Sequence, residues 1–270
     1  MRGLLVLLSL AFLLIPAWGH VGVGTLFELG WDAWDVGMAG AGLALASGPG
    51  AVFTNPAGIA WGGGLQALCS SSDLFGVASV SSLSASVPGF GIGGIVLDSG
   101  PIDEGLRYRA EGAVAALGIP VSENFALGGR VRVLRHVLPK EGIGWAMDLG
   151  ASLRGPLSIG VGVEGLVARA PVPGESWPPS VSFGLALPLP LGEPLAGALA
   201  GAVTGLGEVV AFSLGAELWA QGLGVRVGYS GEKLACAVSV GWGAFRLSLA
   251  TELHAALPAS FKASLKVMFR

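Results

Sequence analysis

The chain has 270 residues, of which 52% are hydrophobic and only 12% charged, with a mean hydropathy of +0.70. Soluble domains carry about 25% charged residues, so this chain has too few charges for an ordinary water-facing surface, and its net charge of −3 argues against a nucleic-acid partner. Glycine makes up 46 of the 270 residues, which is about 17% of the chain against the usual ~7%. The composition leaves a helical membrane protein, a glycine-rich soluble protein or a β-barrel.

Residues 1–19 have the pattern of a secretory signal peptide. Arg2 supplies the positive start, and the apolar run Gly3 to Ile15 is followed by small residues at positions −3 and −1, which predicts cleavage before His20. An uncleaved anchor is the alternative, but this run is shorter than the ~20 apolar residues that span a bilayer as a helix. The sequence therefore predicts export of a mature chain.

Residues 20–62 form a segment rich in glycine and alanine, with the sequence GWDAWDVGMAGAGLALASGPGAVFTNPAGIAW from Gly30. Met38 to Ala46 is compatible with a helix, which the following Ser-Gly-Pro-Gly breaks. A second short helix is predicted at Pro56, because Asn55 is a favoured N-cap and proline suits the first helical position. Local physics alone favours an ordinary N-terminal loop with a capped turn, but the rest of the chain changes that balance.

From residue 63 onward the hydrophobic period is two, the period of a β-strand. In the last run, FKASLKVMFR, apolar side chains alternate with basic or small ones. Turn residues such as Pro88-Gly89 and Gly155-Pro156 separate similar runs at short intervals. About fourteen runs follow one another, with roughly 15 residues per strand and turn, which fits membrane strands of about 9–11 residues.

One face of each run is apolar and free of charge in its middle, whereas a soluble β-sandwich would turn charges outward. A helical span at 195–214 is a further alternative, but glycines and Glu208 interrupt it. Only a closed barrel satisfies the backbone of strands within lipid. We therefore predict an all-β protein, a transmembrane antiparallel up-and-down β-barrel at residues 63–270, with an N-terminal partly helical plug in its lumen. The charged side chains predicted to face the lumen are Arg107, Arg109, Glu111, Arg130, Arg132, Asp148, Glu164, Glu217, Arg226, Arg246, Lys262 and Lys266.

This organisation resembles the FadL-type transporters of hydrophobic compounds, in which an N-terminal stretch ending in Asn-Pro-Ala forms a hatch inside the barrel. The piece ELGWDAWDVGMAGAGLALASGPGAVFTNPAGIA is similar to the PorV/PorQ-like branch, and so are LDSGPIDEG, ENFALGGRVRVLRH and GWAMDLGASLR. The resemblance covers most of the mature chain and implies that residues 20–62 are the hatch. The residues assigned to the plug motif are Asp32, Asp35, Asn55, Pro56 and Ala57. The chain differs in its short turns, where FadL-type transporters have long capture loops.

Three functions stay open at this point. The first is passive passage of a hydrophobic small molecule through a plugged barrel in the bacterial outer membrane. The second, implied by the PorV-like branch, is a barrel component of protein secretion or surface attachment, and the third is a structural outer-membrane protein. Membrane lipids are expected partners in each case, with a hydrophobic ligand in the first and secretion proteins in the second.

No enzyme signal stands out, because His136 and His254 are isolated and no metal-ligand spacing occurs. No metal site or cofactor is predicted, and the two cysteines are expected to be unpaired. Charges shielded from water need partners, so at least one of Asp32 and Asp35 is expected to pair with an arginine or lysine of the lumen. The alternative places both acids in water at the barrel mouth.

Overall fold

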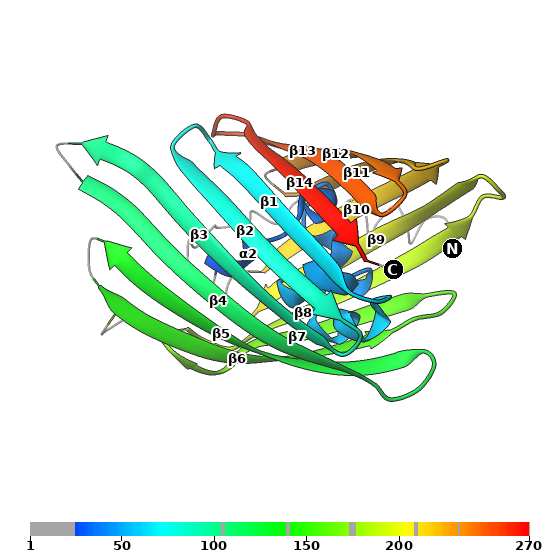
Figure 1. Ribbon diagram of the computed structural model, residues 1–270, viewed down its shortest axis with the longest axis horizontal. Coiled ribbons are helices and arrows are strands. Elements are labelled where there is room, and N and C mark those ends of the chain that lie inside the picture. Colours follow the sequence, from blue (N-terminus) through cyan, green and yellow to red (C-terminus); the bar gives the residue numbers. More distant parts are fainter. Residues whose placement is uncertain are drawn as a thin grey trace.

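A computed structural model describes residues 25–269, apart from 104–105, 139–140, 173–176, 208–209 and 232. The predicted signal peptide and its cleavage site before His20 lie outside the described residues. Short helices come first, followed by a long series of strands (Figure 1). The helices are α2 (Thr25–Glu28), α3 (Ala33–Val36), η1 (Ala41–Ala44), η2 (Gly48–Val52) and η3 (Pro56–Trp61).

Fourteen strands follow, each antiparallel to its neighbours in sequence, and β1 pairs with β14 to close the barrel. The closing register sets Gln66 opposite Met268. The strands are β1 (Gln66–Leu74), β2 (Ala78–Val87), β3 (Phe90–Asp103), β4 (Leu106–Pro120), β5 (Phe125–Leu138), β6 (Gly142–Leu153), β7 (Ser158–Arg169), β8 (Ser180–Pro190), β9 (Leu195–Leu206), β10 (Ala211–Ala220), β11 (Leu223–Ser230), β12 (Lys233–Trp242), β13 (Phe245–His254) and β14 (Ser260–Met268).

The two faces of the wall differ as the period of two requires. In β5, Val131 and Val133 point outward and are each 41% exposed. Arg132 and Leu134, which alternate with them, point inward and are buried. The outward face is apolar over most of the wall, and its charged side chains, such as Asp73 and Arg135, lie toward the top of their strands, so lipid can replace water along the middle of most strands at no cost to charged groups. Outside the gaps given above, residues 25–269 contain no helix long and apolar enough to cross a membrane.

The two ends of the barrel are not alike. We call the end where β1 begins and β14 finishes the base, on the right in Figure 1, and the opposite end the top. Strands β3 to β5 have 14 or 15 residues, whereas β10 to β14 have 8 to 10. The connections at the base are short, and the connection between β7 and β8, residues 170–179, lies at the top.

The structure contradicts the predicted lumen position of three charged residues in β4. Ala110, Val114 and Ala116 are buried inside the barrel, so the residues of opposite parity, Arg107, Arg109 and Glu111, point outward. Arg107 pairs with Asp98 and Arg109 with Glu111, and the arginine side chains are 47% and 40% exposed. They lie near the top of a long strand, where outward charges can meet water or headgroups instead of hydrocarbon.

Candidate functional site inside the barrel

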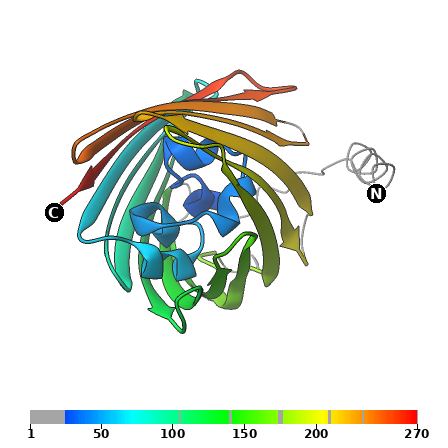
Figure 2. The ribbon, with the colours of Figure 1, turned by 90° about the vertical axis from the view of Figure 1, so that its right-hand side faces the viewer.

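The N-terminal segment, residues 25–62, lies inside the ring of strands (Figure 2). Its helix α3 packs on β12, β13 and β14, η1 on β7 to β10, η2 on β1 to β4, and η3 on β3 to β6. Most of its side chains are buried, including Phe27, Met38 and Ile59 at 1% exposure or less. The segment therefore touches almost the whole inner wall.

Inward-facing glycines let the segment approach the wall backbone to backbone. A Cβ atom on Gly128 of β5 would lie 2.3 Å from the Ala57 nitrogen, and one on Gly160 of β7 would lie 2.7 Å from the Leu43 carbonyl oxygen. Real Cβ atoms essentially never come so close. The wall thus forms a shaped seat in which Ala57, one of the predicted motif residues, contacts β5 directly.

Asn55 and Pro56 fix the start of η3. Asn55 is fully buried, and its Oδ1 accepts a hydrogen bond from the Ala57 N–H at 3.2 Å, as an N-cap does. Its Nδ2 donates to the carbonyl oxygen of Ala151 in β6 at 3.0 Å. One side chain therefore caps the helix and ties it to the wall, which an ordinary surface cap would not do.

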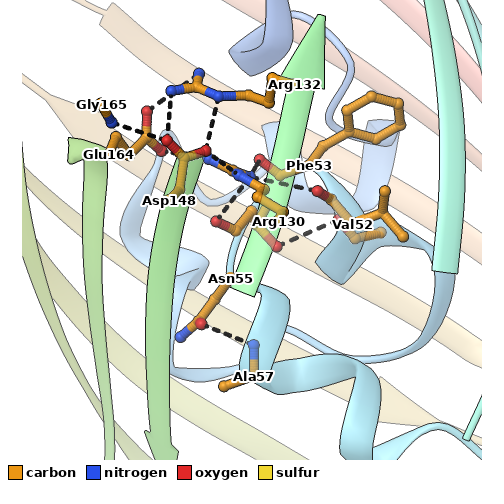
Figure 3. A network of polar contacts seen from close by, with 11 residues as sticks. Val52, Phe53, Asn55, Ala57, Arg130, Arg132, Asp148, Glu164 and Gly165 are labelled. Atoms are coloured by element: carbon orange, nitrogen blue, oxygen red, sulfur yellow. Dashed lines mark hydrogen bonds and ion pairs between the residues drawn. The ribbon is translucent and has the colours of Figure 1, made fainter. Parts of the chain in front are cut away.

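A buried ionic network joins the wall to the turn before η3 (Figure 3). Arg130 and Arg132 of β5 both bind Asp148 of β6, through Nε–Oδ2 distances of 2.6 and 2.7 Å. Arg130 also binds Glu164 of β7 at 2.7 Å. The two arginines and Asp148 have side chains no more than 4% exposed, while that of Glu164 is 27% exposed, so two positive and two negative charges balance within a largely buried site.

This network reaches the N-terminal segment through both arginines. Arg130 Nη1 donates to the carbonyl oxygen of Phe53 at 2.6 Å, with Val52 and Thr54 carbonyls at 3.3 and 3.4 Å. Arg132 in turn stacks over the Phe27 ring, with its Cζ 5.3 Å from the ring centroid. Asp148 accepts a further hydrogen bond from the Gly165 N–H at 2.8 Å. The charge balance keeps Arg130 in place, and Arg130 holds the segment.

A second cluster joins α3 to β10 and β11. Arg226 lies 3.2 Å from Asp35 and 2.6 Å from Glu217, and it donates to the Trp34 carbonyl oxygen at 2.9 Å. Asp32 instead caps α3, accepting from the Asp35 N–H at 2.6 Å. The expected ion pair between an acid of the segment and a lumen cation is therefore formed by Asp35 and Arg226.

The strand that closes the barrel also holds the segment. Lys262 of β14 donates to the carbonyl oxygens of Leu29 and Trp31 at 2.5 and 2.7 Å. Ser264 of β14 accepts from the Ala33 N–H at 3.2 Å. Lys266 faces the lumen further along the same strand, and Arg246 of β13 lies over the ring of Trp219 at 4.7 Å.

Sequence reasoning missed two contributors. Arg154 at the end of β6 stacks over Trp61 at 5.0 Å and donates to the Ala46 carbonyl oxygen at 3.2 Å. Arg154 alternates in phase with the lumen-facing Asp148, and this alternation could have placed Arg154 in the lumen. Trp219 of β10 is the second, because its ring lies 4.5 Å from that of Trp34 inside the barrel.

Apolar and aromatic side chains gather inside the barrel toward the top. Leu97 of β3, Tyr108 of β4 and Trp177 are partly buried and pack against the core that contains Phe27. Leu29 and Trp31 of the segment belong to the same surface. The interior is thus mainly apolar and aromatic on the side of β3 and β4, with the buried His136 beside Tyr108, while the buried ion pairs lie where the segment meets the wall. Among the described residues, no group of three or more His, Cys, Asp or Glu could hold a metal ion.

No protein-family model and no curated protein matches this sequence. Similar solved structures do exist. The monoaromatic hydrocarbon channel CymD has a TM-score of 0.62 at 12% identity, over 90% of this chain and 98% of that one. The fold is that of outer-membrane β-barrel channels. The toluene transporter TbuX of Ralstonia pickettii (TM-score 0.60, 12% identity, 89% of this chain and 99% of that one) and a Pseudomonas aeruginosa FadL homologue (0.58, 11%, 89% and 98%) are similar in the same way. The PorV/PorQ-like assignment stays a prediction from sequence.

Proposed function

We propose that the protein lies in the bacterial outer membrane and allows passive passage of hydrophobic small molecules, with residues 20–62 acting as its plug. The fold shared with hydrocarbon channels supports this proposal, and so does the apolar outer face. The observation that carries it is the interior itself. A segment seated by polar tethers lies beneath an apolar, aromatic surface formed by Leu97, Tyr108 and Trp177.

An apolar surface inside a barrel suits an apolar ligand, because pockets for such ligands are lined mainly by hydrophobic and aromatic side chains. Passage requires the segment to shift, since its backbone touches the wall at Gly128 and Gly160. The tethers Arg130, Arg226 and Lys262 all act on backbone carbonyls of the segment. Such bonds can be exchanged for water when the segment moves, which suits a part that opens and reseats.

The test is uptake of a fluorescent fatty acid and of an aromatic hydrocarbon into liposomes that contain the purified barrel. A lockable variant carries Leu43→Cys and Gly184→Cys, because a Cβ on Gly184 lies 3.0 Å from that of Leu43, close to the 3.5–4.5 Å of a disulfide. The native Cys69 and Cys236, both exposed and free, are replaced by serine in every variant.

We expect the reduced lockable variant to take up probe faster than protein-free liposomes, and the oxidised one to lose that uptake. The matched control carries only Leu43→Cys and should be insensitive to oxidant. Uptake equal to that of protein-free liposomes in the reduced state contradicts transport. Uptake that oxidation leaves unchanged contradicts the plug.

A further inference from the structure

Two tryptophan side chains at the apolar surface of the lumen have buried indole N–H groups with no acceptor. Trp31 of the segment and Trp177 of the connection between β7 and β8 both pack against the core cluster that contains Phe27. Each residue is partly buried, but the Nε1 atom of each is fully buried and has no hydrogen-bond partner among the described residues. An indole N–H can only donate, so each group needs an acceptor.

A buried tryptophan N–H without a partner is unusual, because such groups normally find one. Trp61 follows that rule, since its Nε1 donates to the Ser152 hydroxyl at 3.2 Å. A buried donor that is left without an acceptor lowers stability. Trp31 and Trp177 belong to the surface that is proposed to contact the passing molecule, which indicates that this molecule supplies the acceptor.

The other polar groups at this surface do not favour a charged ligand. The hydroxyl oxygen of Tyr108 lies 3.5 Å from His136 Nε2, and the two rings meet edge to face. The guanidinium of Arg132 lies over the Phe27 ring but is already bound to Asp148 and Glu164. A carboxylate would lose its water here without gaining a free counter-ion, which is costly. A neutral oxygen would not incur that cost.

We propose that the lumen prefers apolar molecules that carry a neutral hydrogen-bond acceptor, such as an aromatic ketone or ester, over plain hydrocarbons and over carboxylates. Trp31 and Trp177 donate to the acceptor, while Leu97 and the ring of Tyr108 contact the apolar part. This inference rests on the proposed passage of hydrophobic molecules and names the class of molecule that passes.

The two donors also couple the ligand to movement of the segment. Both Nε1 atoms are covered while the segment is seated, so a ligand reaches them only when the segment shifts, as passage already requires. A ligand that binds one of two states more strongly moves the population toward that state. A molecule with an acceptor therefore favours the shifted state more than a hydrocarbon of the same shape does.

The test compares ethylbenzene, acetophenone and benzoate, which are similar in size and present a hydrocarbon, a neutral carbonyl and a carboxylate. Binding to the full barrel in neutral detergent is measured by isothermal titration calorimetry, and the heat of each ligand in detergent alone is subtracted. We expect acetophenone to bind about tenfold or more tightly than ethylbenzene, as one or two hydrogen bonds allow. Benzoate should bind most weakly.

Trp31→Phe and Trp177→Phe keep an aromatic ring and remove the N–H group. Each should reduce the preference for acetophenone over ethylbenzene about threefold, and the double variant should abolish it. The preference is a ratio within one variant, so the space left by the smaller ring affects both ligands alike. Trp242→Phe is the matched control, because Trp242 is 51% exposed, and it should keep the full preference. Heat-modifiable migration confirms that each variant is folded.

Equal affinities for ethylbenzene and acetophenone in the parent protein, or a preference that the double variant keeps, overturn the inference. Tightest binding of benzoate, or no binding of any of the three ligands, overturns it as well. The proposed passage is decided separately by liposome uptake of an aromatic hydrocarbon. Uptake of the hydrocarbon without a preference for acetophenone rejects the inference alone, and a preference without uptake rejects passage alone.

Discussion

Replacing Asp148 by asparagine should destabilise the barrel more than any exposed charge change. Asp148 is 2% exposed and accepts from Arg130, Arg132 and the Gly165 N–H. Removing its charge leaves two buried guanidinium groups with only Glu164 between them. Loss of one partner of a buried pair costs about 3–5 kcal/mol. Because the Glu164 side chain is 27% exposed, water offsets part of this, and we expect about 3 kcal/mol.

The assay is equilibrium urea unfolding of the protein in lipid vesicles, followed by tryptophan fluorescence. Glu111→Gln is the matched control, because it breaks the exposed pair with Arg109 and should cost under about 1 kcal/mol. A double variant, Arg132→Gln with Asp148→Asn, removes one charge of each sign and leaves the balanced pair of Arg130 and Glu164. It should recover about 1 kcal/mol or more of the loss from Asp148→Asn. A change in Asp148→Asn as small as in the control, or a double variant whose losses simply add, would refute the charge-balance reasoning.

Three further changes test the seat, the outer face and the second tether. Gly128→Ala should destabilise the protein by about 1–3 kcal/mol, because its Cβ would meet the backbone of residue 57 at 2.3 Å. Gly129→Ala is the control, because a Cβ there has no contact under 3.7 Å. Equal urea midpoints for the two variants would contradict the close contact between Gly128 and the segment. Val131→Arg places a charge on the outward face and should cost roughly 2–4 kcal/mol in folding into lipid, whereas Val77→Arg in the turn at the top should not; equal folding yields would mean that Val131 does not face lipid. Asp35→Ala removes one partner of Arg226 and should raise the open-state conductance in planar bilayers; unchanged conductance would show that this pair does not hold the segment.

The strands could be predicted from sequence because the period of two and the turn residues are local signals. The same local reading failed in β4. Near Leu106 the charges on odd positions looked like a lumen face, but Leu117 and Ile119 have the same parity and are 54% and 62% exposed. The even positions carry small residues such as Ala110 and Gly112 because the N-terminal segment packs there. Alternation separates two faces, but it does not say which one is outside.

The tethers could be predicted only in part. Shielded charges require partners, and this reasoning foresaw a pair between an acid of the segment and a lumen cation. It could not choose Arg226 over the other cations, because the choice depends on how far each strand is shifted along the barrel. The bonds from Lys262 and Arg130 to backbone carbonyls have no sequence signature, since every residue has a carbonyl group.

The way β14 holds residues 29–33 has a consequence for the order of assembly. Closing the barrel joins Gln66 to Met268, and bringing together the ends of so long a loop costs about 5 kcal/mol of chain entropy. The N-terminal segment continues directly into β1, and it binds Lys262 and Ser264 of the last strand. Once it has settled on β12 to β14, the first strand is already beside the last. The segment then acts as an internal template for closure, and a chain that lacks it should fold into membranes more slowly even where the finished wall is equally stable.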